Sequence, residues 1–294
     1  MNHVKTALLL TVMTVLLVLL GRWLGGPTGM VIAFGFALVM NVGSYWFSDK
    51  IVLAMYRAQP ISPSEAPELY RMVERLCERA SLPMPKLYVI QDPTPNAFAT
   101  GRDPQHSAVA VNEGLLRILS HEEVEGVVAH ELAHIKNRDT LISTIAATMA
   151  GAVTMIAHMG QYALLFAGMG GRDRDEDSNP LGMLIMVIVA PIAATIIQLW
   201  ISRTREFQAD RTGSEICGRP LALASALQKL ERAVEVRPMH AEPSTAHMFI
   251  VNPLRGSSFR SLFSTHPSTQ ERVQKLEALA SEMGAAGQTA YSWR

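Results

Sequence analysis

The sequence predicts a mainly helical α+β protein, in which four transmembrane helices accompany a cytoplasmic domain with a small β-sheet. Composition is the first observation behind this prediction: 49% of the 294 residues are hydrophobic and only 18% are charged, which is too apolar for an ordinary soluble protein of this size. The second is that the apolar residues are concentrated in four long runs. The third is that the chain between the runs alternates helical periodicity with short aliphatic stretches.

The four apolar runs form two pairs, and each run is long enough to cross about 30 Å of hydrocarbon as a helix. A cleaved signal peptide is the alternative for the first run, but no small-x-small cleavage site follows it cleanly and a second run comes at once. Four crossings place both ends of the chain on one side of the membrane. The runs are Ala7 to Leu20 with the flanking Arg22-Trp-Leu, Thr28 to Phe47, Leu141 to Met169, and Leu181 to Ile201.

These runs divide the chain into a transmembrane hairpin (1–47), a cytoplasmic half (48–140), a second transmembrane hairpin (141–201) and a second cytoplasmic half (202–294). The positive-inside rule orients them, because the two opposite loops offer only Arg22, Arg172 and Arg174. The termini are therefore predicted to face the cytoplasm. The basic residues on that side are Lys5, Lys50, Arg57, Lys136, Arg138, Arg203, Arg205, Arg211 and Arg219.

The first cytoplasmic half is predicted to begin with a helix that follows Pro63 to Pro67 and ends at Leu82-Pro-Met-Pro85. Short strands and a further helix should come next, because aliphatic stretches alternate with polar turns. These strands are expected at Lys86 to Gln91, Pro95 to Gly101 and Ser107 to Val111, and the helix from about Asn112 to Leu119.

Ser120 and Glu123 form a plausible capping box for the next helix. Because no proline occurs from Glu122 to Met149, this helix is expected to continue straight into the third transmembrane span. After Asp210, helices are expected to about Cys217, from Pro220 to Val236, and over a last segment with Arg272 and Leu276, with a frayed tail from Gly284 onward.

The helix after Ser120 carries the chemistry, in His130-Glu-Leu-Ala-His134. Two histidines four residues apart project from one face of a helix, close enough to share a zinc ion. Glu131 lies beside them, in position to take a proton from a water that the zinc has acidified. The pattern predicts a zinc-dependent peptidase with one Zn²⁺ per chain. Balanced charge, 26 basic against 26 acidic residues, predicts no nucleic-acid partner.

A catalytic zinc needs a third protein ligand and leaves a fourth position to water. Glu206 is the candidate, because it lies six residues after Trp200, as His134 lies seven before Leu141. At a helix rise of about 1.5 Å per residue, Glu206 would lie about 9 Å and His134 about 10 Å from the membrane, so the two ligands are at similar heights. Asp210, four residues after Glu206, is placed to hold the other nitrogen of a zinc-bound histidine. Competing third ligands are His240, Glu242, His247 and His266.

Four motifs in this order, interleaved with four spans, resemble the HtpX family of membrane zinc metallopeptidases over nearly the whole chain. They are Asn96-Ala-Phe-Ala-Thr-Gly101, His130-Glu-Leu-Ala-His134, Ser202-Arg-Thr-Arg-Glu-Phe-Gln-Ala-Asp210 and Thr265-His-Pro267. The resemblance implies a zincin-like domain and an endopeptidase of the bacterial inner membrane, acting in stress response and protein quality control. It would cleave damaged or misassembled membrane proteins at the cytoplasmic face. It also supports Glu206 as the third zinc ligand.

Two further roles depend on this resemblance. Asn96, Ala97, Phe98 and Ala99 would belong to an edge strand beside the cleft that holds an extended substrate, although a simple hairpin turn is the alternative. His266 would stabilise the oxyanion of the reaction, although a Thr-His-Pro stretch also serves as a helix entry.

Two other functions compete with this prediction. A non-catalytic zinc sensor or scaffold would usually fill all four zinc positions with protein ligands, commonly Cys, and neither Cys77 nor Cys217 is near the motif. A prenyl-protein endopeptidase would need a large chamber within the membrane, which four spans are too few to enclose.

Overall fold

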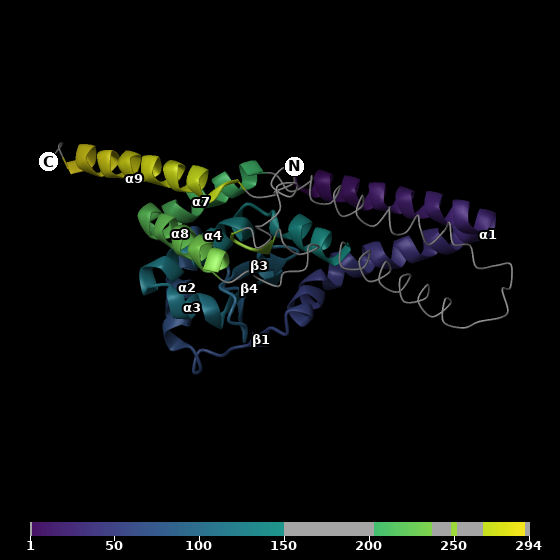
Figure 1. Ribbon diagram of the computed structural model, residues 1–294, viewed down its shortest axis with the longest axis horizontal. Coiled ribbons are helices and arrows are strands. Elements are labelled where there is room, and N and C mark those ends of the chain that lie inside the picture. Colours follow the sequence, from purple (N-terminus) through teal and green to yellow (C-terminus); the bar gives the residue numbers. More distant parts are fainter. Residues whose placement is uncertain (1, 150–202, 237–247, 252–266, 292–294) are drawn as a thin grey trace.

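The structure, a computed structural model, describes residues 2–149, 203–236, 248–251 and 267–291. Its longest element is α1 (Asn2–Met55), which consists of two helices joined at Gly25 and Gly26. Gly26 has a φ of +59° and a ψ of −146°, a conformation that is essentially restricted to glycine. The chain turns back here, and the two legs of α1 extend together away from the rest of the molecule (Figure 1).

Both legs of α1 are long and apolar enough to cross a membrane, over Thr6–Trp23 and Gly25–Met55, as the composition predicted. A hydrogen bond joins them, because the Nδ2 of Asn41 donates to the Oγ1 of Thr14 over 2.8 Å. Such bonds connect membrane helices that apolar contact alone holds weakly. The second leg continues beyond its predicted end to Met55 and contacts strands of the sheet.

The second predicted hairpin is described only at its start. The helix Thr140–Met149 is apolar, and its Ile142 and Ile145 are buried against Leu9 and Met13 of the first leg of α1. This contact brings the start of the third predicted span into one bundle with the first. The rest of that span and the fourth span lie outside the described residues.

A mixed four-stranded sheet lies next to these helices, with the strand order β1-β2-β4-β3. Strand β2 is parallel to β4, and β3 and β1 are the antiparallel edge strands. Strand β1, with only two residues, has no periodicity to reveal it in the sequence. The strands are β1 (Gln59–Pro60), β2 (Lys86–Ile90), β3 (Ala97–Gly101) and β4 (Ser107–Asn112), with the short 3-10 helix η1 (Pro104–His106) before β4.

The two faces of the sheet pack against different layers. Phe98 and Ala110, on one face, are buried with Val52 of α1 and Ala147 of the helix Thr140–Met149. Ala99 and other residues of the opposite face belong to the main core with α2 and α4. Because side chains alternate along a strand, the sheet forms a layer between the apolar helix ends and the helical core.

Helix α4 lies at the centre of that core and contacts α2, α7, α8 and β3. It is buried on nearly all sides, so it has no solvated face along most of its length. Helix α9 continues past Gly284 to Tyr291, so the predicted frayed tail is helical instead, and it extends to the side of the molecule opposite α1 (Figure 1). The helices are α2 (Pro67–Ala80), α3 (Glu113–Ile118), α4 (His121–Lys136), α7 (Arg203–Cys217), α8 (Pro220–Val236) and α9 (Thr269–Tyr291).

Candidate metal centre

The predicted capping box starts α4, because Ser120 accepts from the backbone N–H of Glu123 while the side chain of Glu123 accepts from that of Ser120. Helix α7 packs closely on α4 at the level of His130. A Cβ on Gly213 would come within 2.8 Å of the Cα of His130, so only glycine permits this approach. The close packing places the acidic residues of α7 beside the histidines of α4.

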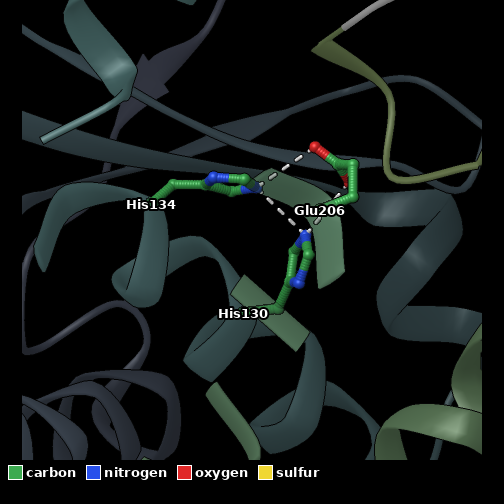
Figure 2. A group of neighbouring side chains, drawn as sticks. All are labelled: His130, His134 and Glu206. Atoms are coloured by element: carbon green, nitrogen blue, oxygen red, sulfur yellow. Dashed lines mark hydrogen bonds and ion pairs between the residues drawn. The ribbon is translucent and has the colours of Figure 1, made fainter. Parts of the chain in front are cut away.

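Three predicted ligands meet at this contact, and His130, His134 and Glu206 point toward one another (Figure 2). The two Nε2 atoms are 3.1 Å apart. Glu206 lies between them, with Oε1 3.7 Å from the Nε2 of His134 and Oε2 3.7 Å from the Nε2 of His130. His130 and Glu206 are buried, whereas the side chain of His134 is 17% exposed and borders a cleft.

This arrangement fits a metal cation. Each histidine has a carboxylate near its Nδ1, Asp210 at 3.0 Å from His130 and Asp139 at 3.1 Å from His134. When each Nδ1 carries a proton toward its carboxylate, both Nε2 atoms present lone pairs to the same point. Two imidazole lone pairs and one carboxylate then converge with no donor among them. Two histidines and one carboxylate are the ligand set of a catalytic zinc with an open fourth position.

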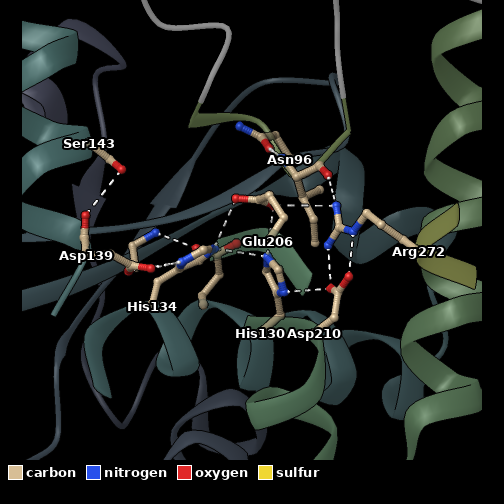
Figure 3. A network of polar contacts seen from close by, with 11 residues as sticks. Asn96, His130, His134, Asp139, Ser143, Glu206, Asp210 and Arg272 are labelled. Atoms are coloured by element: carbon tan, nitrogen blue, oxygen red, sulfur yellow. Dashed lines mark hydrogen bonds and ion pairs between the residues drawn. The ribbon is translucent and has the colours of Figure 1, made fainter. Parts of the chain in front are cut away.

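The support of His130 comes from two helices that are distant from α4 in the sequence (Figure 3). Asp210 of α7 is held in turn by Arg272 of α9, whose Nε donates to Oδ2 over 2.8 Å and whose Nη2 donates to Oδ1 over 2.6 Å. Burial opposes a charged Asp210, but Arg272 and His130 hold its pKa below the usual value. Burial also lowers the pKa of His130. A neutral imidazole and a charged carboxylate are the states that metal binding requires.

The support of His134 is local. Helix α4 ends at Lys136, so the prediction that it would continue into the third span is wrong. The N–H of Asp139 donates to the carbonyl of His134 over 3.2 Å and that of Arg138 to Ile135 over 3.1 Å, the pattern of a Schellman motif. Arg138 holds the left-handed position, with a φ of +57°, where glycine is usual. This turn brings Asp139 back to His134.

Glu131 lies beside this group and is buried under the edge strand. The backbone N–H of Ala99 donates to its Oε2 over 2.8 Å. Burial, with a contribution from Glu206, raises the pKa of Glu131 to about 7. A carboxylate with a pKa near neutrality is suited to both accepting and returning a proton.

A cleft of about 40 Å³ opens over these residues. At about 10 to 15 Å³ for a water-sized group, it has room for about three such groups, enough for an ion and water. Phe98 and Ala99 of β3 form one wall, and residues 248–250 form another. Both backbone groups of Ile250 are fixed, its N–H by the Oδ1 of Asn96 (3.2 Å) and its carbonyl by the Nη1 of Arg272 (2.7 Å).

The structure therefore brings together the three predicted ligands, with Asp210 3.0 Å from His130 and Glu131 lining the same cleft. Strand β3 lies at the sheet edge, with Phe98 and Ala99 beside the cleft, while the side chain of Asn96 binds the cleft wall. Predicted His266 and the competing ligands His240, Glu242 and His247 lie outside the described residues.

Sequence reasoning missed Asp139 and Arg272 as parts of the site. Arg272 left a signal, because it shares a helical face with the buried Leu276 and Leu279, where a charge requires a partner. Asp139 had no such signal in the sequence, because the turn that places it beside His134 has no glycine or proline. Arg205 also lines the cleft and is buried.

A helix with two histidines, a carboxylate ligand from a second helix and an adjacent buried carboxylate defines the class of metallopeptidases. The profile of peptidase family M48 matches residues 63–280. A protein named "Protease HtpX homolog" from Thermococcus sibiricus is 55% identical over 96% of this chain and 97% of its own length. One of the same name from Desulfatibacillum aliphaticivorans is 55% identical over 97% of this chain and 92% of its own.

The chain therefore belongs to peptidase family M48 and, within it, to the HtpX family, as its four motifs predicted. Among solved structures, a crystal structure of Ste24p from S. mikatae is 19% identical, with a TM-score of 0.48. The match covers 84% of this chain and 57% of that one.

Proposed function

We propose that this protein is a zinc-dependent endopeptidase of the bacterial inner membrane that cleaves damaged or misassembled membrane proteins at the cytoplasmic face. The observation that carries the proposal is that a buried carboxylate, Glu131, lines the same cleft as three converging ligands at the edge of a sheet. A scaffold in which zinc only joins helices would have no use for such a carboxylate. The relatives named as proteases and the two apolar legs of α1 support the same function and location.

His130, His134 and Glu206 would hold the ion. Bound zinc supplies a Lewis acid that makes a water acidic near neutral pH and polarises the substrate carbonyl. Glu131 takes up the proton of the attacking water and passes it to the amine of the leaving peptide, while the N–H of Ala99 holds its Oε2 in place. Asp210 and Asp139 keep the Nδ1 protons of the two histidines, so that both Nε2 lone pairs face the ion.

An extended substrate would lie along the outer edge of β3. The carbonyl of Asn96 pairs with β4, and since alternate residues of a strand point their backbone groups to opposite sides, those of Ala97 and Ala99 point outward. The N–H of Ala99 is bound to Glu131, so a substrate would pair with the backbone groups of Ala97 and with the carbonyl of Ala99. Strand addition at this edge would bring a peptide bond beside Glu131. His266 would then donate to the oxyanion of the tetrahedral intermediate.

The test is the variant Glu131→Gln, in the full chain loaded with zinc. The amide cannot accept the proton of the water, so casein cleavage should fall at least about 100-fold while the zinc content stays at that of the parent. Glu122→Gln, on the same helix with its side chain 59% exposed, is the matched control and should keep both. Proteolysis by Glu131→Gln near the rate of the parent would exclude Glu131 as the base.

A further inference from the structure

The position of the membrane surface can be read from the second leg of α1. Between Val31 and Phe47 its large apolar side chains are exposed, as they would be to lipid, whereas Val52 is fully buried in the domain. From Gly26 to Trp46 the helix rises about 30 Å, the thickness of the hydrocarbon layer. Trp46 is 50% exposed, and an aromatic residue at this position is typical of the lipid–water interface. The surface therefore passes near Trp46.

The edge strand that faces the metal centre lies directly beneath this surface. Arg102, in the turn after β3, lies over the ring of Trp46, with its guanidinium carbon 4.8 Å from the ring centroid. The Oγ1 of Thr140, where the apolar helix Thr140–Met149 begins, donates to the carbonyl of Gly101 over 3.0 Å. Phe98 packs against Val52 and Ala147, which belong to the ends of the membrane helices. No further layer separates the described part of the sheet from these helix ends.

This arrangement fixes the depth of the site. Phe98 of β3 packs against Val52, which lies six residues beyond Trp46, or about 9 Å of helix rise, so a peptide added to β3 would lie about 10 Å below the membrane surface. An extended chain covers that distance in about three residues, at about 3.3 Å each. Residues on both sides of the cleaved bond must then lie along the strand, which adds two or three more.

We propose, on the basis of the protease function proposed above, that the cleft selects segments adjacent to a membrane span, and that the cleaved bond lies about four to eight residues from the end of that span. A shorter connection cannot reach β3. A longer one reaches it less often, because the local concentration of a tethered segment falls roughly as the −3/2 power of its length. Doubling the connection twice, from four residues to 16, lowers that concentration about eightfold.

The experiment uses the full zinc-loaded chain and single-span reporters in phospholipid vesicles. Each reporter joins its span to one fixed cleavable sequence, identified beforehand in a soluble peptide, through polar spacers that place the cleaved bond about 2, 4, 8, 16 and 32 residues from the end of the span, chosen to bracket the expected reach. The initial cleavage rate should be greatest at about four to eight residues, at least about fivefold lower at two and severalfold lower at 32. Glu131→Gln in the same vesicles gives the background.

Equal rates at all spacers, or rates that rise continuously with length, would overturn this proposal. The soluble peptide separates the two proposals. When it is cleaved by the parent chain but the reporters show no optimum, the protease function stands and the depth selection does not. When neither the peptide nor any reporter is cleaved, the proposed function itself has failed.

Discussion

The two histidines of the candidate metal centre lie one helical turn apart, yet the chain supports them in different ways. His130 is fully enclosed, and its carboxylate, Asp210, comes from α7 and is neutralised by Arg272 of α9. His134 borders the cleft, and its carboxylate, Asp139, lies five residues further along the chain. The first support therefore needs three helices to pack together, whereas the second needs only one turn. The comparison teaches that identical ligands can depend on the tertiary structure to different degrees.

Removing the ligand common to both sides should have the largest effect. Glu206 faces both Nε2 atoms at 3.7 Å, so Glu206→Ala leaves only two ligands, too few for a catalytic zinc. We expect the zinc content to fall from about one ion per chain to less than about a tenth, with loss of proteolysis. Elemental analysis after gel filtration measures it. Glu215→Ala, exposed on the same helix, is the matched control, and a normal zinc content in Glu206→Ala would show that another residue is the third ligand.

Removing Arg272, the cation that neutralises the carboxylate beside His130, should have the next largest effect. Arg272→Gln leaves Asp210 as a buried carboxylate without its cation, and removing one partner of a buried pair destabilises a protein by roughly 3 to 5 kcal/mol. Thermal unfolding of the metal-free protein in detergent measures this effect. Glu277→Gln, exposed on the same helix, should change little.

A double variant sharpens the same prediction. Arg272→Met with Asp210→Leu removes both charges, so it should regain much of the stability that Arg272→Gln loses, while zinc binding stays weak. Recovery of zinc binding together with stability would mean that the pair only holds the helices together and does not orient His130.

A direct comparison of the two carboxylates should give a smaller difference. Loss of a carboxylate that orients a metal-bound histidine weakens metal binding roughly 10- to 100-fold. We expect Asp210→Ala at the upper end of this range and Asp139→Ala at the lower end, because water can reach His134 and replace part of the lost contact. Competition with a chelator of known affinity orders the two variants. The opposite order would mean that His134 depends more on its carboxylate than His130 does.

The smallest predicted effect is on pH dependence without metal. Burial opposes a charged His134, but Asp139, Glu206 and Glu131 raise its pKa to about 10. A raised folded-state pKa stabilises the protein fully below the unfolded value, about 6.5, and this stabilisation is lost as the pH rises to about 10. Asp139→Asn should therefore lower the unfolding temperature of the chelated protein more at pH 6 than at pH 10. An equal effect at both pH values would contradict a charged pair of His134 and Asp139.

Much of the site could be predicted from local periodicity. A helix places residues four apart on one face, so His130 with His134, and Glu206 with Asp210, had to form two matched pairs. The similar heights of Glu206 and His134 relative to the predicted spans then selected Glu206 over the competing ligands. The same reasoning predicted both legs of α1, because only apolar composition and length decide whether a helix can cross a membrane.

The end of α4 could not be predicted, although it lies within this same motif. Helix ends are recognised by glycine or proline, and here Arg138 adopts the left-handed conformation instead, which is unfavourable by about 1 to 2 kcal/mol for such a residue. The surrounding contacts hold the turn in place, including the bonds from Thr140 to Gly101 and between Thr100 and Thr144. They join segments about 40 residues apart in the chain, and no local pattern reports them.

The sequence by itself determined the two apolar legs of α1, the paired histidines with the neighbouring Glu131, and the carboxylate residues able to complete the site, since composition and helical spacing are properties of neighbouring residues. Only the tertiary structure decided that α7 approaches α4 at Gly213, that Arg272 neutralises Asp210, and that the sheet lies against the membrane helices. The physical reason is that burial creates these relations. A carboxylate needs a cation, and a helix needs a glycine at its contact, only when packing has removed water and space from around them.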